Sequence, residues 1–273
     1  TQALTLPETP LTVEGASVLH QMMRVRWPAW NALPAARRRE IVAEAGAALG
    51  AMEQRREAQS ALYSLLGHKG DLLLLHFRKD FAGLHEAELE LSRLALWEYL
   101  EPATSYLSVV ELSLYESTAK VYASLFGKGV HPHSEEWNRE IAAVLERQRT
   151  AMVPRLWPEI PKARYICFYP MDRKREGAAN WYQAPMTERQ RMMKEHGEIG
   201  RRYGDHVRQI ISGSIGFDDW EWGVDLFGDD PLVFKRLIYE MRFDEASAVF
   251  AKFGPFYIGV RRPATELGAL LDR

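Results

Sequence analysis

Residues Ala163 to Gly223 have the sequence ARYICFYPMDRKREGAANWYQAPMTERQRMMKEHGEIGRRYGDHVRQIISGSIGFDDWEWG, and the rest of the chain is organised around this segment. Its pattern predicts a strand over Tyr165–Met171, a helix over Thr187–Tyr203 and a second strand over Val207–Ile215. Each element places at least one polar side chain on a face that is otherwise apolar, so these polar residues are the first candidates for function.

Side chains two residues apart share one face of a strand. Tyr169 and Arg173 therefore lie on the same side of the first strand, with Tyr165, Cys167 and Met171 between and before them. The other side carries Ile166 and Phe168. Because both sides are apolar, the pattern predicts a strand that is buried on both faces.

His196 lies at helical spacing within the apolar stripe of the predicted helix, and Gln209 lies between Val207 and Ile211 in the next strand. A phenol, an imidazole and an amide on the inner faces of three consecutive elements suggest a pocket. A hydrogen-bonded core histidine, a packed tyrosine and a glutamine that satisfies a neighbour would give the same pattern. Periodicity alone leaves both interpretations open.

The two halves of the chain can be laid on each other. At an offset of 151, Pro34, Arg38, Glu44 and Gly46 fall on Pro185, Arg189, Glu195 and Gly197, and at an offset of 150, Phe77, Asp80 and Glu90 fall on Phe227, Asp230 and Glu240. A repeat of this length predicts an α+β fold of two βαββαβ ferredoxin-like modules. His196 falls on Ala45, so only the second module has the imidazole.

Periodicity predicts further elements on both sides of the opening stretch. In the N-terminal half these are strands Ser17–Val25, Leu72–Phe77 and Ser105–Tyr115 and helices Pro34–Glu53 and Asp80–Tyr99; later elements are helices Ser134–Trp157 and Pro231–Met241 and strands Trp222–Phe227 and Phe256–Val260. The domain boundaries that follow are residues 1–116, a helical connector at 117–161, and residues 162–273. His131-Pro-His133 in the connector could be a metal pair, but a solvated loop fits the intervening proline better.

Composition excludes several functions. The hydrophobic content of 47% supplies a core, and the net charge of −2 gives no reason to expect a nucleic-acid partner. A single cysteine, Cys167, excludes an internal disulfide and a C-x-x-C-H haem attachment, and it favours a reducing compartment. Without a signal peptide or an apolar run near eighteen residues, we expect a cytoplasmic protein with no membrane span.

Four segments carry a resemblance to a known family: Cys167–Met171, Lys194–Gly197, Ile215–Asp219 and Met241–Ser247. They resemble the chlorite dismutase superfamily and, more narrowly, its coproheme decarboxylase branch. The resemblance is strong from Arg155 to Gly259 and implies two modules packed sheet to sheet. It also implies a homo-oligomer, usually a pentamer. A ferrochelatase is a further partner that the sequence leaves open.

The resemblance implies a role for each candidate residue. His196 would be the proximal iron ligand, and Tyr169 the catalytic residue that carries a radical. Binding of Fe-coproporphyrin III would involve Arg155, Tyr169, Pro170, Met171, Asp172, Arg173, His196, Gln209 and Ser247. Arg173 stands where relatives commonly have a lysine, so either Arg173 or Lys174 supplies that charge.

The activity so implied is a peroxide-dependent decarboxylation of two propionates of Fe-coproporphyrin III, which gives haem b. Gln209 stands where chlorite-degrading members have an arginine, and an uncharged amide disfavours chlorite chemistry. A chlorite dismutase or peroxidase-like haem enzyme and a non-enzymatic haem-binding or transfer protein remain alternatives. Trp220 could line the pocket or belong to the core.

Overall fold

The N-terminal half forms one ferredoxin-like module in the computed structural model, which describes residues 6–272. Four antiparallel strands lie in the order β2-β3-β1-β4, and helices join them in the βαββαβ pattern that the sequence predicts. The elements are β1 (Thr12–Val25), α1 (Trp27–Asn31), α2 (Ala35–Gln54), β2 (Ser60–Leu65), β3 (Leu72–Arg78), α3 (Phe81–Ser92), η1 (Ala95–Tyr99) and β4 (Leu100–Ser113).

The C-terminal half repeats this arrangement. Its strands lie in the order β11-β5-β9-β8, with β10 on the same edge of β5 as β11. The main elements are β5 (Tyr165–Arg173), α7 (Met186–Arg202), β8 (Arg208–Gly213), β9 (Trp222–Gly228), α8 (Pro231–Met241), α9 (Glu245–Phe250), β10 (Ala251–Phe253) and β11 (Tyr257–Arg262). Short pieces complete it: β6 (Arg175–Glu176), β7 (Ala179–Asn180), η2 (Trp181–Gln183), η3 (Ala264–Glu266) and α10 (Leu267–Leu271).

The two modules close into one antiparallel barrel. Their sheets face each other, as predicted, and they also pair edge to edge through β4 with β8 and through β11 with β2. The interior is filled from both halves, with Val18 and Leu75 of one module packed in the same cluster as Phe168 and Phe227 of the other. Gly259 lies where β11 passes between the modules. A Cβ there would come within 2.9 Å of Ile166 and Tyr63, so only glycine fits.

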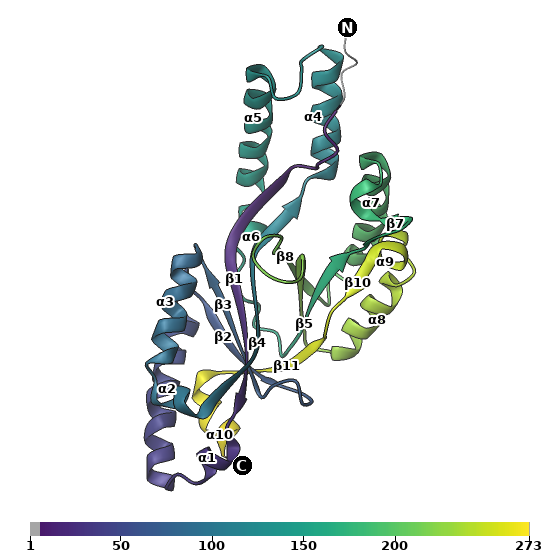
Figure 1. Ribbon diagram of the computed structural model, residues 1–273. Helices are drawn as coiled ribbons and strands as arrows, with labels where there is room; N and C mark the ends of the chain where they lie inside the picture. Colours follow the sequence, from purple (N-terminus) through teal and green to yellow (C-terminus); the bar gives the residue numbers. More distant parts are fainter. Residues whose placement is uncertain (1–5, 273) are drawn as a thin grey trace.

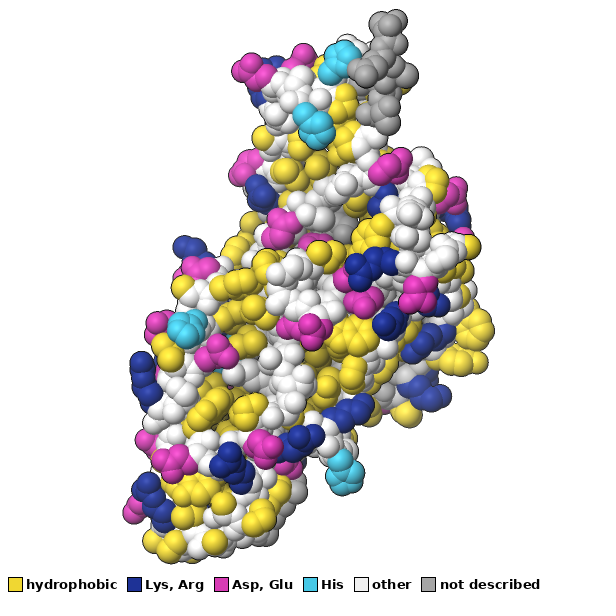
Figure 2. Space-filling model, in the orientation of Figure 1, with side chains coloured by type: hydrophobic (Ala, Val, Ile, Leu, Met, Phe, Trp, Pro, Cys, Tyr) yellow, Lys and Arg dark blue, Asp and Glu magenta, His cyan; other side chains and the backbone are white. Residues whose placement is uncertain are grey.

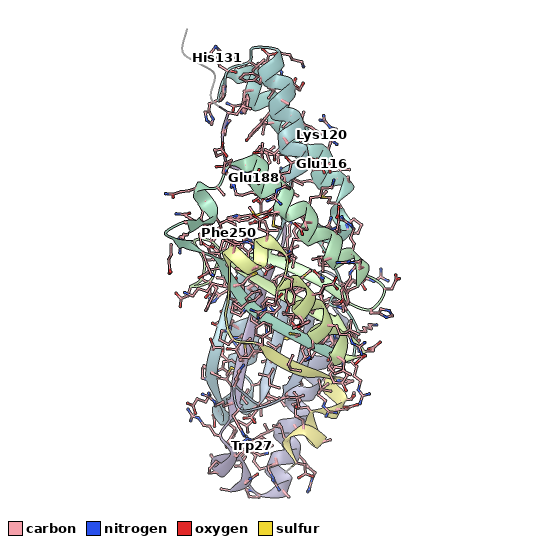
Figure 3. The ribbon with its side chains drawn as sticks, turned by 90° about the vertical axis from the view of Figure 1, so that its right-hand side faces the viewer. Trp27, Glu116, Lys120, His131, Glu188 and Phe250 are labelled. Carbon is pink, nitrogen blue, oxygen red and sulfur yellow. The ribbon has the colours of Figure 1, made fainter. Side chains whose placement is uncertain are left out.

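Helices cover the outside of this barrel (Figure 1). α2, α3 and α10 cover the N-terminal module, and α7, α8 and α9 cover the C-terminal one. α4 (Tyr115–Gly127) and α5 (Glu135–Ala151) form a hairpin that projects from the barrel, and α6 (Val153–Leu156) lies at its base. Figure 3 shows His131 at the tip of this hairpin and Trp27 at the opposite end of the molecule.

The observed elements differ from the predicted ones in several parts of the chain. The prediction missed β2, because residues on both of its faces are buried and leave no alternation. The helix predicted over Asp80–Tyr99 ends at Ser92. The N–H of Ala95 bonds the carboxylate of Glu44 at 3.0 Å, and the chain continues as η1.

The third difference concerns the connector. The helix predicted over Ser134–Trp157 begins as expected, since the side chain of Ser134 accepts a hydrogen bond from the Trp137 N–H at 3.2 Å. It divides into α5 and α6 at Met152, because Pro154 cannot continue the helix. α4 was not predicted. Within residues 6–272, no helix is long and apolar enough to cross a bilayer.

Candidate functional site

The candidate site begins with His196 on α7. Met192 and Ile199 bury the inner face of this helix, and His196 lies between them with about a quarter of its side chain exposed. Its Nδ1 lies 2.9 Å from Oδ2 of Asp244, whose side chain is fully buried. The imidazole is therefore fixed by a partner on one nitrogen and is not enclosed on the other.

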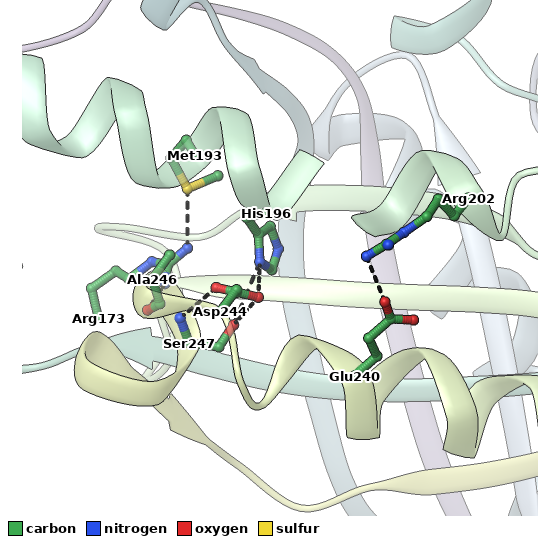
Figure 4. A network of polar contacts seen from close by, with 8 residues as sticks. All are labelled: Arg173, Met193, His196, Arg202, Glu240, Asp244, Ala246 and Ser247. Atoms are coloured by element: carbon green, nitrogen blue, oxygen red, sulfur yellow. Dashed lines mark hydrogen bonds and ion pairs between the residues drawn. The ribbon is translucent and has the colours of Figure 1, made fainter. Parts of the chain in front are cut away.

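Asp244 orients the imidazole from the start of α9 (Figure 4). As the N-cap of this helix, it accepts the Ser247 N–H at Oδ1, 2.9 Å away, and the Ser247 hydroxyl donates to Oδ2 at 3.2 Å. Burial opposes ionisation of Asp244. The hydrogen bonds and charge of His196, together with the Ser247 bonds, outweigh burial and hold the pKa of Asp244 below its usual range.

An ionised Asp244 determines the tautomer of His196. A carboxylate only accepts hydrogen bonds, so Nδ1 carries the proton and Nε2 keeps its lone pair. A buried carboxylate on Nδ1 is the arrangement that fixes ring orientation and raises basicity in metal-binding histidines. Nε2 is therefore suited to bind a metal ion that already has its other ligands.

Tyr169 lies on β5, on the face that the alternation of the sequence predicts. It packs with Cys167 and with Ile199 of α7, while Phe168 points into the barrel. Its ring stacks on Phe256 at 4.5 Å between centroids. Burial raises the pKa of the Tyr169 phenol well above its usual range, so the phenol keeps its proton at neutral pH.

Arg173 ends the same strand and ties it to α9. Its guanidinium donates to the Ala246 carbonyl at 2.8 Å and to the Met193 sulfur at 3.4 Å, and it lies 4.6 Å from the ring centre of Trp181. Burial lowers its pKa against the opposing charges of Tyr115 and Asp244. Arg173 therefore supports the segment that holds Asp244.

Gln209 faces α7 from β8. A Cβ built on Gly200 would lie 3.4 Å from the Gln209 amide nitrogen and 3.3 Å from Cε of Met241, so the helix backbone approaches the strand closely here. Gln209, the helix that carries His196 and the strand that carries Tyr169 thus line one region between α7 and the sheet. A flat macrocycle in this region would need movement of α7 or of the Met241 and Gln209 side chains.

The remaining sequence candidates fall into three groups. Met171 and Ser247 lie on elements that line this region, and Lys174 follows the end of β5 with its N–H bonded to the Phe250 carbonyl at 2.6 Å. Pro170 and Asp172 lie on the opposite face of β5. The Pro170 carbonyl accepts from Gly254, and Oδ1 of Asp172 accepts from the Glu221 N–H, which indicates structural roles.

Arg155 and Trp220 lie elsewhere. Arg155 is exposed on α6, and this helix packs on β1 and β4. Within residues 6–272, Arg155 forms no hydrogen bond with His196, Asp244 or Ser247. Trp220 packs against the barrel interior, as its core interpretation predicts, with the Lys252 ammonium 5.6 Å from its ring centre.

Sequence reasoning missed two residues of the site. Asp244 lies within Met241–Ser247, one of the segments that carry the family resemblance, but the sequence analysis assigned it no role. Its position just before a short helix is one that an N-cap aspartate commonly takes. Arg242 lies 3.8 Å from the ring centre of Phe253, and its charge lowers the pKa of Tyr169 against the larger effect of burial. Nothing in the sequence pattern points to this stacking.

The donor set fits an iron porphyrin better than a metal held by protein ligands alone. Within residues 6–272, no group of three or more His, Cys, Asp or Glu side chains could hold a metal ion. One imidazole with a free Nε2, next to cations that can pair with carboxylates, is what a porphyrin that already supplies four nitrogens requires. Among the described residues, His196 is thus the candidate that could supply one imidazole ligand to such a group.

Comparison with known proteins identifies the family. The model of the chlorite dismutase family matches residues 38–262, which is most of the chain. The protein therefore belongs to the chlorite dismutase family.

Solved structures agree with this assignment. The chain is 39% identical to a protein described as a novel heme-binding protein from Thermus thermophilus, with 98% of this chain and 99% of that chain covered and a TM-score of 0.82. A mutant chlorite dismutase from Candidatus Nitrospira defluvii is 16% identical, with 96% and 97% covered and a TM-score of 0.71. Chlorite dismutase from Candidatus Nitrospira defluvii in complex with imidazole is 17% identical, with 95% and 96% covered and a TM-score of 0.70. The last two show the shared fold.

Proposed function

We propose that the protein is a coproheme decarboxylase, which uses hydrogen peroxide to convert two propionates of Fe-coproporphyrin III into vinyl groups and so makes haem b. The observation that carries the proposal is the combination of a carboxylate-oriented imidazole, His196, with a protonated phenol, Tyr169, that packs against the same helix. Membership of the chlorite dismutase family and similarity to a heme-binding protein from Thermus thermophilus support a porphyrin ligand.

In this proposal His196 binds the substrate iron through Nε2, and Asp244 holds the ring in that orientation. Arg173, which ends β5 near Tyr169, balances propionate charge, and the Ser247 hydroxyl is a further propionate contact. Arg155 makes the remaining propionate contact if α6 moves toward the site when the substrate binds. Because Arg173 already bonds Ala246 and Met193, the adjacent Lys174 remains the alternative source of this charge. An arginine at position 173 would not transfer a proton, since its pKa is too high.

The substrate iron supplies the redox chemistry with peroxide, and the protein supplies position and a radical carrier. Tyr169 loses a hydrogen atom and regains one from the β-carbon of a propionate. The C–COO⁻ bond then breaks, carbon dioxide leaves, and the second electron returns to the iron. Each propionate consumes one peroxide and one proton and gives one vinyl group, one carbon dioxide and two waters.

Two alternative functions, a haem carrier and a chlorite- or peroxide-degrading enzyme, are each supported by one observation. The relative from Thermus thermophilus is described only as heme-binding, which favours a carrier. Membership of the chlorite dismutase family favours chlorite or peroxidase-like chemistry. Gln209 argues against chlorite degradation, because an amide provides no positive charge to hold the chlorite anion.

The test is a peroxide titration of the protein loaded with Fe-coproporphyrin III, followed by mass spectrometry. The enzyme loses two carboxyl masses in sequence. Tyr169→Phe keeps binding and loses decarboxylation by about a thousandfold or more. Tyr165→Phe, on the same strand and face, is the matched control and keeps activity. A Tyr169→Phe variant with unchanged turnover contradicts the proposal, and binding without turnover in the wild type indicates a carrier.

The proposal places this chemistry in residues 162–273, with residues 1–116 as the module without a haem site and 117–161 as the connector. It also includes a homo-oligomer, with a pentamer as the expected form. Size-exclusion chromatography with light scattering measures the subunit count, and a monomer in solution contradicts this part.

A further inference from the structure

The outer face of α8 carries an exposed apolar stripe. The inner face of this helix is buried through Phe234 and Leu237. Leu232 and Tyr239 on its outer face are 55% and 64% exposed, and Phe243, two residues past the end of the helix at Met241, is 73% exposed. The rings of Tyr239 and Phe243 contact each other edge to face, 5.3 Å between centroids. Large apolar side chains grouped on a surface mark a site of interaction more often than single ones do.

The same face carries positive charge. Lys235, Arg236 and Arg242 are exposed beside the stripe, and within residues 6–272 none of the three forms an ion pair with a carboxylate. Figure 2 shows Lys and Arg side chains among hydrophobic ones along the right-hand edge, where α8 lies. We call Leu232, Lys235, Arg236, Tyr239, Arg242 and Phe243 the α8 stripe.

Two carboxylates beside the α8 stripe are already paired with cations. Glu240 binds Arg202 and accepts the Tyr203 hydroxyl, and Glu245 binds Arg191. Asp230 accepts the Leu232 N–H as the cap of α8. Asp229 likewise accepts a backbone N–H, from Arg164. The three cations of the α8 stripe outnumber these two carboxylates, so the charge that remains on this face is positive although the whole chain has a net charge of −2.

The duplicated module shows that the fold does not require the α8 stripe. At the offset of 150, α3 occupies the position of α8, and its outer positions are Ala82, His85, Glu86, Leu89, Ser92 and Arg93. α3 thus has no tyrosine or phenylalanine at these positions. Glu86 stands in place of the guanidinium of Arg236, and Arg93 stands in place of Phe243. Both helices cover the same face of equivalent sheets, so the difference calls for a partner of the C-terminal module alone.

We propose that the α8 stripe docks on the surface of an anionic lipid bilayer. Leucine, tyrosine and phenylalanine side chains on one face of a helix insert at the boundary of headgroups and acyl chains, and flanking lysine and arginine pair with lipid phosphates. The long cationic side chains without fixed carboxylate partners suit the diffuse charge of a lipid surface. Phe243 directly precedes Asp244, so docking places the His196 site next to the bilayer. The proposal does not depend on the reaction assigned above.

The experiment is cosedimentation of the full chain with vesicles of equal parts phosphatidylglycerol and phosphatidylcholine, at low and at high salt. The wild type sediments with these vesicles, less so at high salt, and stays in solution with pure phosphatidylcholine. The variant K235E/R236E loses about tenfold or more of its vesicle affinity, because four units of charge change near the surface. Phe243→Ser loses several-fold, and its loss does not depend on salt.

The matched control is R37E/R39E on α2, which changes the net charge of the chain by the same amount at exposed positions far from α8. It keeps wild-type vesicle affinity. Three results overturn the proposal: a wild type that does not sediment with anionic vesicles, equal loss in the control, or self-association that Phe243→Ser abolishes without any vesicle binding. The last result would make the α8 stripe a contact between copies of the chain, and failure of decarboxylation would leave the vesicle result unchanged.

Discussion

The two modules begin their first long helix with the same turn and then differ in what the helix buries. Pro34 and Pro185 precede α2 and α7 with nearly identical backbone angles, φ −56° and ψ 143° against φ −55° and ψ 144°. Residue Arg38 and its counterpart Arg189 each donate their N–H to the preceding proline carbonyl at 3.1 Å. Ala45 on α2 is fully buried, whereas its counterpart on α7 is the partly exposed His196.

The surroundings of these two positions differ in the same way. Around α2 the core is rich in leucine, and Leu267 of α10 packs in the same buried cluster. Around α7 the corresponding layer contains Tyr169, Arg173 and Asp244, each with a specific contact. The same fold therefore supports a closed apolar layer in one module and a polar site in the other. The fold of a module does not determine whether it carries a site.

The largest effect is expected when an imidazole is placed in the module that lacks the site. Ala45→His puts a bulky polar ring into a fully buried position without a partner. Overpacking and an unpaired polar group lower the free energy of unfolding by about 2–4 kcal/mol. Urea unfolding measures this, with Ala36→His on the exposed face of α2 as the control. Equal stability of the two variants would show that the N-terminal layer is not closed.

Asp244→Asn removes the carboxylate that distinguishes the C-terminal module. The amide can still accept from His196 Nδ1, but it loses the charge and one of the contacts to Ser247. Affinity for ferric porphyrin falls about 10- to 100-fold, the usual effect of losing such a partner. Absorption titration measures it. Asp230→Asn, which alters the cap of α8 instead, keeps wild-type affinity; if both variants bind alike, Asp244 does not act through His196.

Arg173→Lys tests the link between β5 and α9. Lysine keeps the charge but loses the bond to the Ala246 carbonyl and the planar contact with Trp181. We expect a loss of about 1–2 kcal/mol in the free energy of unfolding. Arg175→Lys, at an exposed position, changes it by less than about 0.5 kcal/mol. Thermal or denaturant unfolding decides between a structural and a purely electrostatic Arg173.

The smallest expected effect is a pH dependence of the free energy of unfolding that comes from Asp244. The N-terminal module has no counterpart of this carboxylate, since Leu94 stands at the equivalent position. The pKa of Asp244 is lower in the folded chain than its reference value of 3.8. Its stabilising contribution is therefore complete above about pH 4 and is lost as the pH falls through the folded pKa. The difference in unfolding free energy between wild type and Asp244→Asn shrinks over that range. A difference that stays constant down to pH 2 would mean that Asp244 is not ionised in the fold.

Most of the fold follows from local pattern. Alternation on β5 separates Phe168 from Tyr169 correctly, because each faces a different apolar cluster. The repeat predicts two modules. β2 was not predicted, because a strand that is buried on both faces shows no alternation of polar and apolar residues. The end of α3 was predicted wrongly, because it depends on a contact between Glu44 and Ala95, two residues that are 51 positions apart in the sequence.

The site was predictable only in part. Helical spacing placed His196 on the inner side of α7, and strand alternation placed Tyr169. The bond from His196 to Asp244 joins residues 48 apart, and the stacking of Arg242 on Phe253 depends on how α8 meets β10. Such contacts are tertiary, so periodicity within one element carries no information about them.

The central claim is that Nε2 of His196 binds the iron of a porphyrin in the C-terminal module. Resonance Raman spectra of the protein with coproporphyrin III whose iron has been reduced to the ferrous state, before and after addition of free imidazole, test it directly. The wild type gives an iron–imidazole signal, His196→Gly loses it, and free imidazole restores it. Identical spectra of wild type and His196→Gly without imidazole would contradict the account.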